Sequence, residues 1–277
     1  MKKIQLARKI CTYILLITYI SILLFPFIWM ISTSLKRPED IYTLELEIIP
    51  LHPTFENYMY LIRETSYTHY LINSFTIAII VALITTIIIS PAAYALSRFN
   101  LKGSKYFSYW LTSTQIISPS LIVIPVYFIM KAFGLLDTYL ALIVTHLAFC
   151  IPFTTWIFKA FLDSIPNEIE EAALLDGCSR IQALFKVIMP IAAPGVVAVS
   201  VFSFIVSWQE FIFAVTLTFR EPMRTLPVGM SLFLGEYRVM WGWVMAGATL
   251  AVLPVIIVFL YLQKYIIMGL TAGAIKR

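Results

Sequence analysis

Long apolar stretches without charged residues divide this chain into segments. Six of them are long enough to cross a bilayer, since a spanning helix needs about 20 mostly apolar residues. They cover residues 10–35, 70–97, 106–130, 138–158, 187–209 and 239–263. The pattern therefore predicts an all-α integral membrane protein with six transmembrane helices.

Composition supports the same class. The chain is 60% hydrophobic and 13% charged, with a mean hydropathy of +0.89, outside the range of soluble globular domains. Its net charge is +5, but the basic residues are scattered at the ends of the predicted spans, which argues against a nucleic-acid interface. Cys11, Cys150 and Cys178 have no regular spacing that would indicate disulfides or a metal site.

Basic residues also predict the orientation in the membrane. The uncharged run after Lys9 is too long for a signal peptide and lacks a small-residue cleavage pattern, so we expect it to remain as the first span. With both termini in the cytoplasm, thirteen basic residues fall inside and seven outside, as the positive-inside rule requires. The thirteen are Lys2, Lys3, Arg8, Lys9, Arg98, Lys102, Lys105, Lys159, Arg180, Lys186, Lys264, Lys276 and Arg277.

Prolines fall inside several predicted spans. Pro91 lies in the second, Pro119 and Pro125 in the third, and Pro152 in the fourth. Neighbouring helices can satisfy the carbonyl groups that a proline leaves free, so bent helices around a cavity are expected. The fifth span is expected to run from about Pro190 towards Phe219.

The segment between the fourth and fifth spans predicts a short helix, a sharp turn and a second helix. Ser164 is a candidate N-cap with Pro166 in the first turn, and glutamates follow where they favour the positive end of a helix. Gly177 should end this helix with a positive φ. Ser179 and Gln182 have the spacing of a capping box, which begins a second helix with Ile181, Leu184, Phe185 and Ile188 on one stripe.

The first of these two helices is predicted to be apolar on two sides. Ile165, Ile169, Ala172 and Ala173 share one face at 100° per residue, whereas Leu174 and Leu175 fall among the glutamates. The first face can rest on the membrane helices, and the second needs another protein. We interpret the helix as a docking element; an ordinary cytoplasmic helical hairpin is the alternative on geometry alone.

The same segment resembles a known signature. Glu171-Ala172-Ala173, Gly177 and Pro190 match E-A-A-x3-G-x9-I-x-L-P of the membrane subunits of ABC importers, with Val187 and Met189 as apolar replacements. The resemblance implies the type I ABC importer transmembrane fold, in which this segment is the cytoplasmic coupling helix that sits in a cleft of the ATPase subunit. The coupling residues it implies are Glu171, Ala172, Ala173, Leu174, Leu175, Asp176, Gly177 and Pro190.

Two further motifs are similar to those of sugar-importer permeases. Ala93–Phe99 looks like the end of their second span, and Trp208-Gln209-Glu210-Phe211 resembles W-N-[DE]-F, with Gln209 replacing the usual Asn. Aromatic rings and hydrogen-bonding groups are what sugar recognition uses, so these four residues are candidates for the translocation path. The alternatives are that such aromatic residues face lipid, or that the partner permease holds the sugar. The resemblance implies a maltose- or trehalose-type system that carries a di- or oligosaccharide.

The sequence contains no phosphate-binding GxxxxGK[ST] pattern and neither HExxH nor GxSxG. We therefore expect no enzymatic activity, no cofactor and no metal in this chain. The resemblance implies that ATP and Mg²⁺ bind to two partner ATPase subunits, and that a homologous second permease and an extracellular sugar-binding protein complete the complex.

Two other readings of the intramembrane polar residues remain. Glu210 could relay protons in a secondary transporter, because carboxylates inside the membrane often serve pumps. His146 and Glu210 could form the site of a membrane enzyme, although they lie on different spans and nothing in the sequence places them together. For His146 itself, a hydrogen-bonded packing role is the simpler expectation.

The expected organisation follows from the spans and the resemblance. Residues 1–35 hold the N-terminal segment and the first transmembrane helix, 36–69 an extracellular loop, 70–266 the type 1 permease core, and 267–277 a cytoplasmic tail. The predicted location is the cell membrane.

The charge asymmetry gives a testable topology. In a cysteine-free background, a single cysteine near Glu45 should react with an impermeant thiol reagent added outside the cell, and one near Lys102 should not. Labelling of intact cells measures this directly. The reverse labelling pattern would overturn every side assignment.

Overall fold

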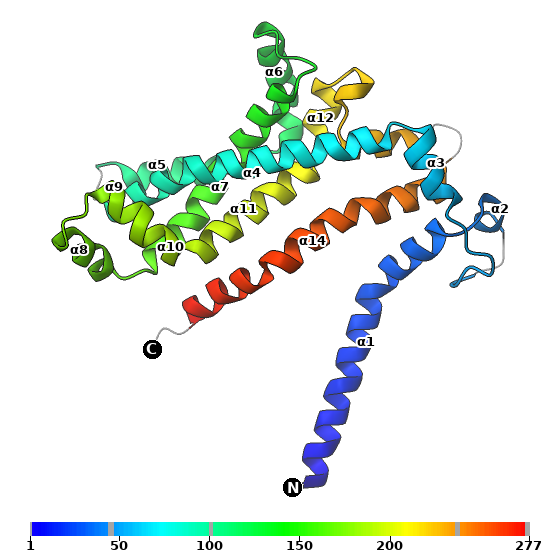
Figure 1. Ribbon diagram of the computed structural model, residues 1–277, viewed down its shortest axis with the longest axis horizontal. Helices are drawn as coiled ribbons and strands as arrows, with labels where there is room; N and C mark the ends of the chain where they lie inside the picture. The colour runs from blue at the N-terminus through cyan, green and yellow to red at the C-terminus, as the bar shows by residue number, and fades with distance from the viewer. Residues whose placement is uncertain (1, 44–46, 100–101, 236–238, 275–277) are drawn as a thin grey trace. The chain divides into compact units, whose positions relative to one another are not determined.

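The protein is built from helices. The computed structural model describes residues 2–43, 47–99, 102–235 and 239–274, and across these ranges it contains no strand (Figure 1). The α-helices are α1 (Lys2–Ser34), α2 (Pro38–Ile41), α3 (Glu56–Glu64), α4 (Tyr67–Arg98), α5 (Ser104–Ser113), α6 (Pro119–Ala132), α7 (Tyr139–Asp163), α8 (Asn167–Leu175), α9 (Arg180–Ala183), α10 (Met189–Ile191), α11 (Ala193–Trp208), α12 (Ile212–Leu217), α13 (Leu226–Ser231) and α14 (Trp241–Ala274). Short 3-10 turns cover Thr114–Ile116, Glu221–Met223 and Leu232–Leu234, and a π-helical turn covers Leu184–Ile188. The predicted all-α class is confirmed.

Four of the predicted spans are single helices. α1, α4, α7 and α14 are each long and apolar enough to cross a membrane. The other two spans are pairs of helices with a sharp bend: 99° between Ser104–Ile116 and Pro119–Ala132, and 79° between Arg180–Ile191 and Ala193–Trp208. If each bent pair is one span, the described part of the chain holds the six that the sequence predicts.

The two bends have local causes. Ser118, just before Pro119, is extended (φ −64°, ψ 137°), because the proline ring disfavours the helical conformation in the residue that precedes it. Ala192 departs from helical geometry (φ −79°, ψ 3°), and Pro194 then lies in the first turn of α11, where its missing N–H is not needed. By contrast, Pro91 and Pro152 lie inside the continuous helices α4 and α7.

The fifth span ends earlier than expected. α11 stops at Trp208, and α12 begins only at Ile212, so the expectation of a helix continuing towards Phe219 is wrong. The side chain of Glu210 accepts the N–H groups of Phe213 and Ala214, which in a continuous helix would bond to main-chain carbonyls one turn earlier. The side chain of Glu210 thus replaces the main-chain carbonyls as acceptor, and the regular helical hydrogen bonding ends here.

Contacts divide the chain into two units. The first consists of Met1–Thr68 and Met230–Leu253, and the second of His69–Gly229 and Pro254–Arg277. In the first unit the buried side chain of Asn57 donates to the carbonyls of Ser34 (2.9 Å) and Lys36 (2.8 Å), which fixes α3 to the end of α1. The Tyr67 hydroxyl donates to the Gly247 carbonyl at 2.7 Å. Glu45, in the predicted outer loop, lies outside the described residues.

The second unit is held by α7, which packs against α5, α11 and α12 (Figure 1). One apolar cluster gathers around Leu142 and Phe213, and another around Phe158 and Ile188. Lipid tails are as apolar as these side chains, so close packing has to hold such helices together. Gly195 of α11 shows how close: a Cβ there would lie 2.7 Å from the ring of Phe161.

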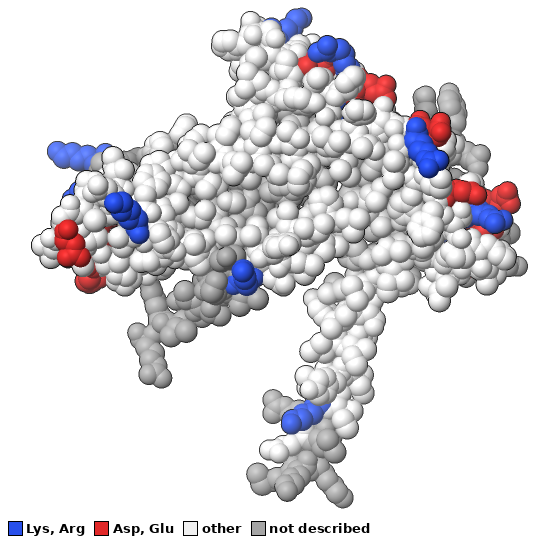
Figure 2. Space-filling view, viewed as in Figure 1, with Lys and Arg blue, Asp and Glu red and all other residues white. Residues whose placement is uncertain are grey.

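Polar side chains of α4 satisfy the irregular backbone that precedes α13. Asn73 donates to the carbonyls of Pro222 (2.8 Å) and Arg224 (2.9 Å), and Ser74 accepts the N–H of Leu226 at 2.8 Å. Tyr139 in turn donates to Asn73 at 2.8 Å. On the face drawn in Figure 2, charged side chains are sparse against a broad surface of other residues.

Asp137 closes the loop between α6 and α7. Its backbone has a positive φ of 62°, and its N–H donates to the Leu217 carbonyl at 2.8 Å. Its carboxylate accepts the N–H groups of Phe219 (3.0 Å) and Arg220 (3.1 Å) and pairs with the Arg220 guanidinium. Burial raises the pKa of Asp137, but the hydrogen bonds from Arg220 and Phe219 outweigh it, so the pKa lies below its usual value.

The hydrogen bonds and ion pair of Asp137 should make the free energy of unfolding depend on pH. A carboxyl whose pKa is lower in the folded state stabilises that state above the unfolded pKa, and the contribution is lost as pH falls through the folded pKa. Asp137→Asn tolerates the positive φ but removes the charge, and should cost on the order of 1 kcal/mol at pH 7, since Arg220 is largely exposed. Thermal unfolding of the purified protein in detergent measures the difference. A difference in thermal stability between the wild type and Asp137→Asn that stays constant down to about pH 3 would contradict the lowered pKa of Asp137.

Candidate functional site

The helix–turn–helix segment starts later than the sequence indicated. α8 begins at Asn167, directly after Pro166, with Glu168 and Glu170 in its first turn. Ser164 is not its N-cap: the residue caps the C-terminus of α7, and its hydroxyl donates to the carbonyl of Phe161 at 2.6 Å. Pro166 fixes the entry instead, because its constrained φ directs the chain into the first helical turn.

The turn after α8 is a Schellman motif. Gly177 has φ +86°, as predicted. The Cys178 N–H donates to the Ala173 carbonyl, and the Gly177 N–H donates to the Leu174 carbonyl, both at 3.1 Å. A Cβ at Gly177 would meet no atom within 4 Å, so the backbone conformation alone demands glycine here.

The predicted capping box of the second helix is confirmed. The Gln182 N–H donates to Ser179 Oγ at 3.3 Å, and the Ser179 N–H donates to Gln182 Oε1 at 2.9 Å. The predicted apolar stripe is split, however. Leu184 and Ile188 are buried, whereas Ile181 and Phe185 are 71% and 57% exposed. The π-helical turn at Leu184–Ile188 contains one extra residue per turn, which interrupts the regular 3.6-residue stripe.

α8 is exposed along one side, but that side differs in part from the prediction. Ile165 and Ala173 are buried and Ile169 is half-buried, as expected, and Leu175 is 89% exposed. The expectation for Ala172 is wrong, because this residue is exposed. The buried place is taken by Glu170, which the sequence had assigned to the solvent side with the other glutamates. The remaining predicted coupling residues Glu171, Asp176, Gly177 and Pro190 are exposed, and Leu174 is half-buried.

Glu170 is buried because it has polar partners. Tyr94 donates to its Oε1 at 2.5 Å, Arg98 Nε lies 3.2 Å from Oε2, and Arg180 Nη1 lies 3.6 Å from Oε1. Sequence reasoning missed this cluster, since helical periodicity groups Glu170 with its solvent-facing neighbours. The available signal was the motif around Arg98, which places a cation at the C-terminal end of α4.

The four candidate path residues lie where α11 unwinds. Trp208 is buried against Phe204 and Phe75, with ring centroids 5.7 and 6.4 Å away. Gln209 and Phe211 are exposed. The structure therefore divides the candidates: Trp208 belongs to the packed interior, and Gln209 and Phe211 present their side chains outward.

Glu210 caps the short helix α12. Its Oε1 accepts the Phe213 N–H at 2.8 Å and its Oε2 accepts the Ala214 N–H at 3.0 Å. A carboxylate at this position satisfies N–H groups that have no main-chain partner in an apolar environment. Its side chain is only 15% exposed.

His146 of α7 meets Glu210 and Ser207. His146 Nδ1 lies 2.7 Å from Ser207 Oγ, and Nε2 lies 3.4 Å from Glu210 Oε2. The imidazole is buried and hydrogen-bonded, as the packing interpretation expected. The sequence offered no sign that His146 and Glu210 come together, and the structure brings them into contact. In the described residues no group of three or more His, Cys, Asp or Glu could hold a metal ion.

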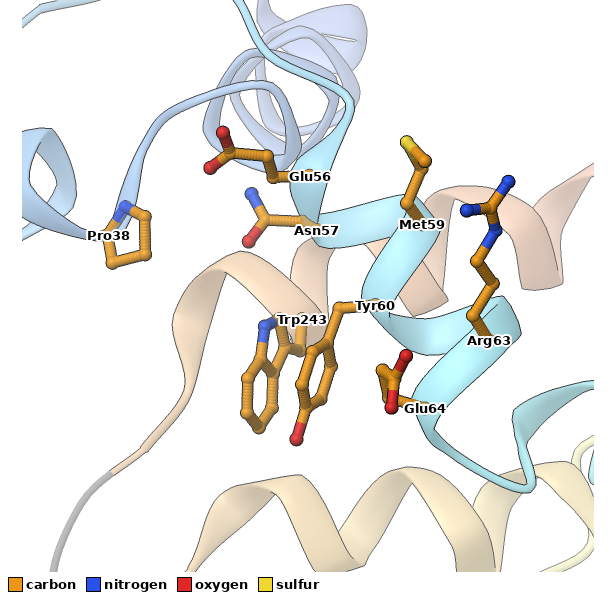
Figure 3. A pocket seen from close by; sticks show the side chains of 8 residues that line it. All are labelled: Pro38, Glu56, Asn57, Met59, Tyr60, Arg63, Glu64 and Trp243. Atoms are coloured by element: carbon orange, nitrogen blue, oxygen red, sulfur yellow. The ribbon is translucent and has the colours of Figure 1, made fainter.

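A hollow of about 450 Å³ opens in the first unit, between α3 and the start of α14 (Figure 3). The rings of Tyr60 and Trp243 lie face to face there, 4.0 Å apart, while Met59 and Arg63 point away from the ring pair. None of the residues that the sequence singled out lies in this hollow.

Comparison with known proteins agrees with this architecture. Residues 98–271 match the family described as "Binding-protein-dependent transport system inner membrane component". The chain is 35% identical to the trehalose/maltose transport system permease protein of Thermococcus litoralis over 98% of each chain, and 35% identical to the trehalose transport system permease protein of Mycobacterium tuberculosis over 91% of this chain and 92% of that protein.

Solved structures show the same fold. A bacterial ABC transporter involved in the import of the acidic polysaccharide alginate superposes with a TM-score of 0.79 at 24% identity, covering 94% of this chain and 96% of that one. The helix–turn–helix of α8 and α9, the four long apolar helices and the two bent pairs are therefore parts of a type I ABC importer fold. The chain belongs to the family of binding-protein-dependent transport system inner membrane components, as a multi-pass permease subunit of an ABC importer.

Proposed function

We propose that this permease subunit forms half of the path by which an ATP-driven importer carries a sugar. Relatives that are similar over nearly their whole length are named for trehalose and maltose, for trehalose, and, in Streptomyces coelicolor, for diacetylchitobiose. All of these are disaccharides or disaccharide-sized. A di- or oligosaccharide such as maltose or trehalose is the proposed substrate.

The proposed complex contains other subunits. A homologous second permease completes the path, two ATPase subunits bind ATP and Mg²⁺ and hydrolyse ATP, and an extracellular binding protein delivers the sugar. The family description names a binding protein, and a second alginate transporter structure, with a TM-score of 0.67, was solved in complex with a periplasmic protein. The absence of a phosphate-binding motif in this sequence supports placing ATP hydrolysis in the partners.

The exposed side of α8 and α9 is the main support for coupling to the ATPase. Leu175, Ile181 and Phe185 are 89%, 71% and 57% exposed, and the charged residues Glu171 and Asp176 lie beside them. Large apolar side chains in this setting indicate a surface that another protein covers. We assign the coupling role to Glu171, Ala172, Ala173, Leu174, Leu175, Asp176, Gly177 and Pro190; buried Ala173 supports the helix from its inner side.

The unwound segment between α11 and α12 is the proposed contact with the translocation path. Exposed Gln209 can hydrogen-bond a sugar hydroxyl, and the exposed ring of Phe211 can stack on a sugar face. Trp208 supports the segment from behind. Glu210 has a structural or gating role, since both of its oxygens hold the start of α12.

The proposed orientation places both termini and the coupling segment in the cytoplasm. The charge asymmetry supports it. The proposed division is a first span within residues 1–35, an outer loop at 36–69, a permease core at 70–266 and a cytoplasmic tail at 267–277. The family match over residues 98–271 falls largely within the proposed core.

Gly177 tests the coupling role. Gly177→Val forces a branched side chain into a left-handed conformation that costs about 1–2 kcal/mol per residue for L-amino acids, whereas Gly177→Asn is a matched control, because Asn tolerates this conformation. We expect the Val variant to insert normally into the membrane but to lose most sugar uptake and most of the ATP hydrolysis that the loaded binding protein stimulates. Reconstituted complexes in proteoliposomes measure both. Normal uptake and normal stimulation in the Val variant would reject the proposal.

Glu210 tests the path. Glu210→Gln keeps a carbonyl oxygen for one N–H group of α12 and should retain most uptake. Glu210→Ala leaves both N–H groups without their acceptor, at about 1–3 kcal/mol for each buried unsatisfied group, and should lower uptake severely. A structural role of Glu210 is distinguished from proton transfer by measuring uptake with ATP supplied and the proton gradient collapsed by an ionophore. Loss of uptake with the gradient, together with loss in Glu210→Gln, would favour proton coupling.

A further inference from the structure

The motif Ala93–Phe99 at the end of α4 has no role in the proposed path or in the ATPase contact, yet two of its three polar side chains, Tyr94 and Arg98, bond to the coupling segment. Tyr94 donates to Glu170 of α8 at 2.5 Å. Ser97 donates to Asp163, the last residue of α7, at 2.7 Å. Arg98 contacts Glu170 and also donates to the Ile165 carbonyl at 2.9 Å and to the Asn167 side chain.

The second helix of the coupling segment joins the same cluster. Arg180, the first residue of α9, lies over the ring of Phe99 at 5.0 Å and 3.6 Å from the Glu170 carboxylate. The Phe99 ring packs edge-on against Tyr94, with centroids 5.8 Å apart. Glu170 therefore lies at the centre of contacts that reach α4, α8 and α9 together.

The ion pair between Arg98 and Glu170 is buried, so each charge depends on the other. The side chains of Arg98 and Glu170 are each only 6% exposed. A pair of this kind adds little net stability over apolar side chains, but removing one partner leaves the other charge buried and unpaired. Such pairs are well suited to fixing one arrangement of helices, because other arrangements separate the charges.

Apart from the Glu170 cluster, α8 packs against α9 and the π-helical turn, and Ile169 packs on the apolar cluster around Phe158 and Ile188. Three residues, Ser164–Pro166, connect α8 to α7, and the Schellman turn with Gly177 connects it to α9. α4, on the other hand, has 32 residues, so it extends for about 48 Å at 1.5 Å per residue. A rigid attachment at its cytoplasmic end can displace a helix of this length as a whole.

We propose that Glu170 is the positioning residue that fixes the coupling helix α8 to α4, so that the two helices move as one body when the ATPase subunits move α8. On α4, Glu170 binds Tyr94 and Arg98, and its contact with Arg180 connects α9 to the same rigid unit. The inference rests on the proposed function of α8, and it assigns to Glu170 a role different from that of exposed Glu171.

The first test measures the sugar imported per ATP hydrolysed by the reconstituted complex. Glu170→Gln should lower this ratio at least about tenfold, the factor that corresponds to 1.4 kcal/mol, while ATP hydrolysis continues. Glu168→Gln is the matched control: the same change on the same helix at an exposed position, expected to leave the ratio unchanged. A ratio within about twofold of the wild type in Glu170→Gln would overturn the proposal.

A double variant separates positioning from simple stability. Arg98→Gln with Glu170→Gln removes both buried charges, so assembly and thermal stability should recover towards the wild type even if Glu170→Gln alone assembles poorly. The ratio of sugar to ATP should stay low in the double variant, because the attachment is still missing. Recovery of the ratio together with stability would show a merely structural role and overturn the proposal.

A distance measurement tests the single body directly. Cysteines replacing Glu168 and Lys102, in a chain without Cys11, Cys150 and Cys178, carry spin labels on α8 and just beyond α4. The distance should be narrow and the same with and without ATP and Mg²⁺, and should broaden or become nucleotide-dependent with Glu170→Gln. A nucleotide-dependent distance in the chain that keeps Glu170 would reject the inference. A wild-type complex without ATP-driven uptake would instead reject the proposed function, and the distances would still be readable.

Discussion

Backbone hydrogen bonding in a solvent without water governs this structure. Inside a bilayer every N–H and carbonyl needs a partner from the protein, so a helix can be interrupted only where side chains replace the lost bonds. Glu210 does so at the start of α12, where its two oxygens take two N–H groups. At the start of a predicted span, Asn73 likewise donates to the carbonyls of Pro222 and Arg224, which lie in the loop between the fifth and sixth spans. The irregular segments of the second unit are stable because polar side chains hydrogen-bond to their free backbone groups.

The parts predictable from sequence are those fixed by local chemistry. Gly177 needs a positive φ, and Ser179 with Gln182 forms a reciprocal cap; both can be recognised within a few residues. The apolar spans can be recognised from the length of the uncharged apolar runs. Proline was less informative: the chain breaks at Pro119 but continues as helix through Pro91, because tertiary packing decides whether the free carbonyl finds another partner.

The parts that could not be predicted depend on residues far apart in the chain. Helical periodicity places Glu170 with exposed glutamates, and only the arrival of Arg98 and Tyr94 from α4 makes its burial favourable. His146 and Glu210 are likewise 64 positions apart, and no local pattern joins them. Glu170 is buried because a distant helix supplies donors, and Glu210, whose donors are local, contacts an imidazole from a distant helix. A single sequence reveals neither contact.

A π-helical turn covers Leu184–Ile188, between α9 and the bend at Ala192. Such a turn holds one residue more than an α-helical path of the same length. Removing any one residue from it would restore regular bonding and rotate everything on its N-terminal side by about 100° about the helix axis. Ile181 would then turn away from the surface it shares with Phe185. In this stretch, a single insertion or deletion would therefore change which side chains are exposed more than the exchange of one apolar side chain for another would.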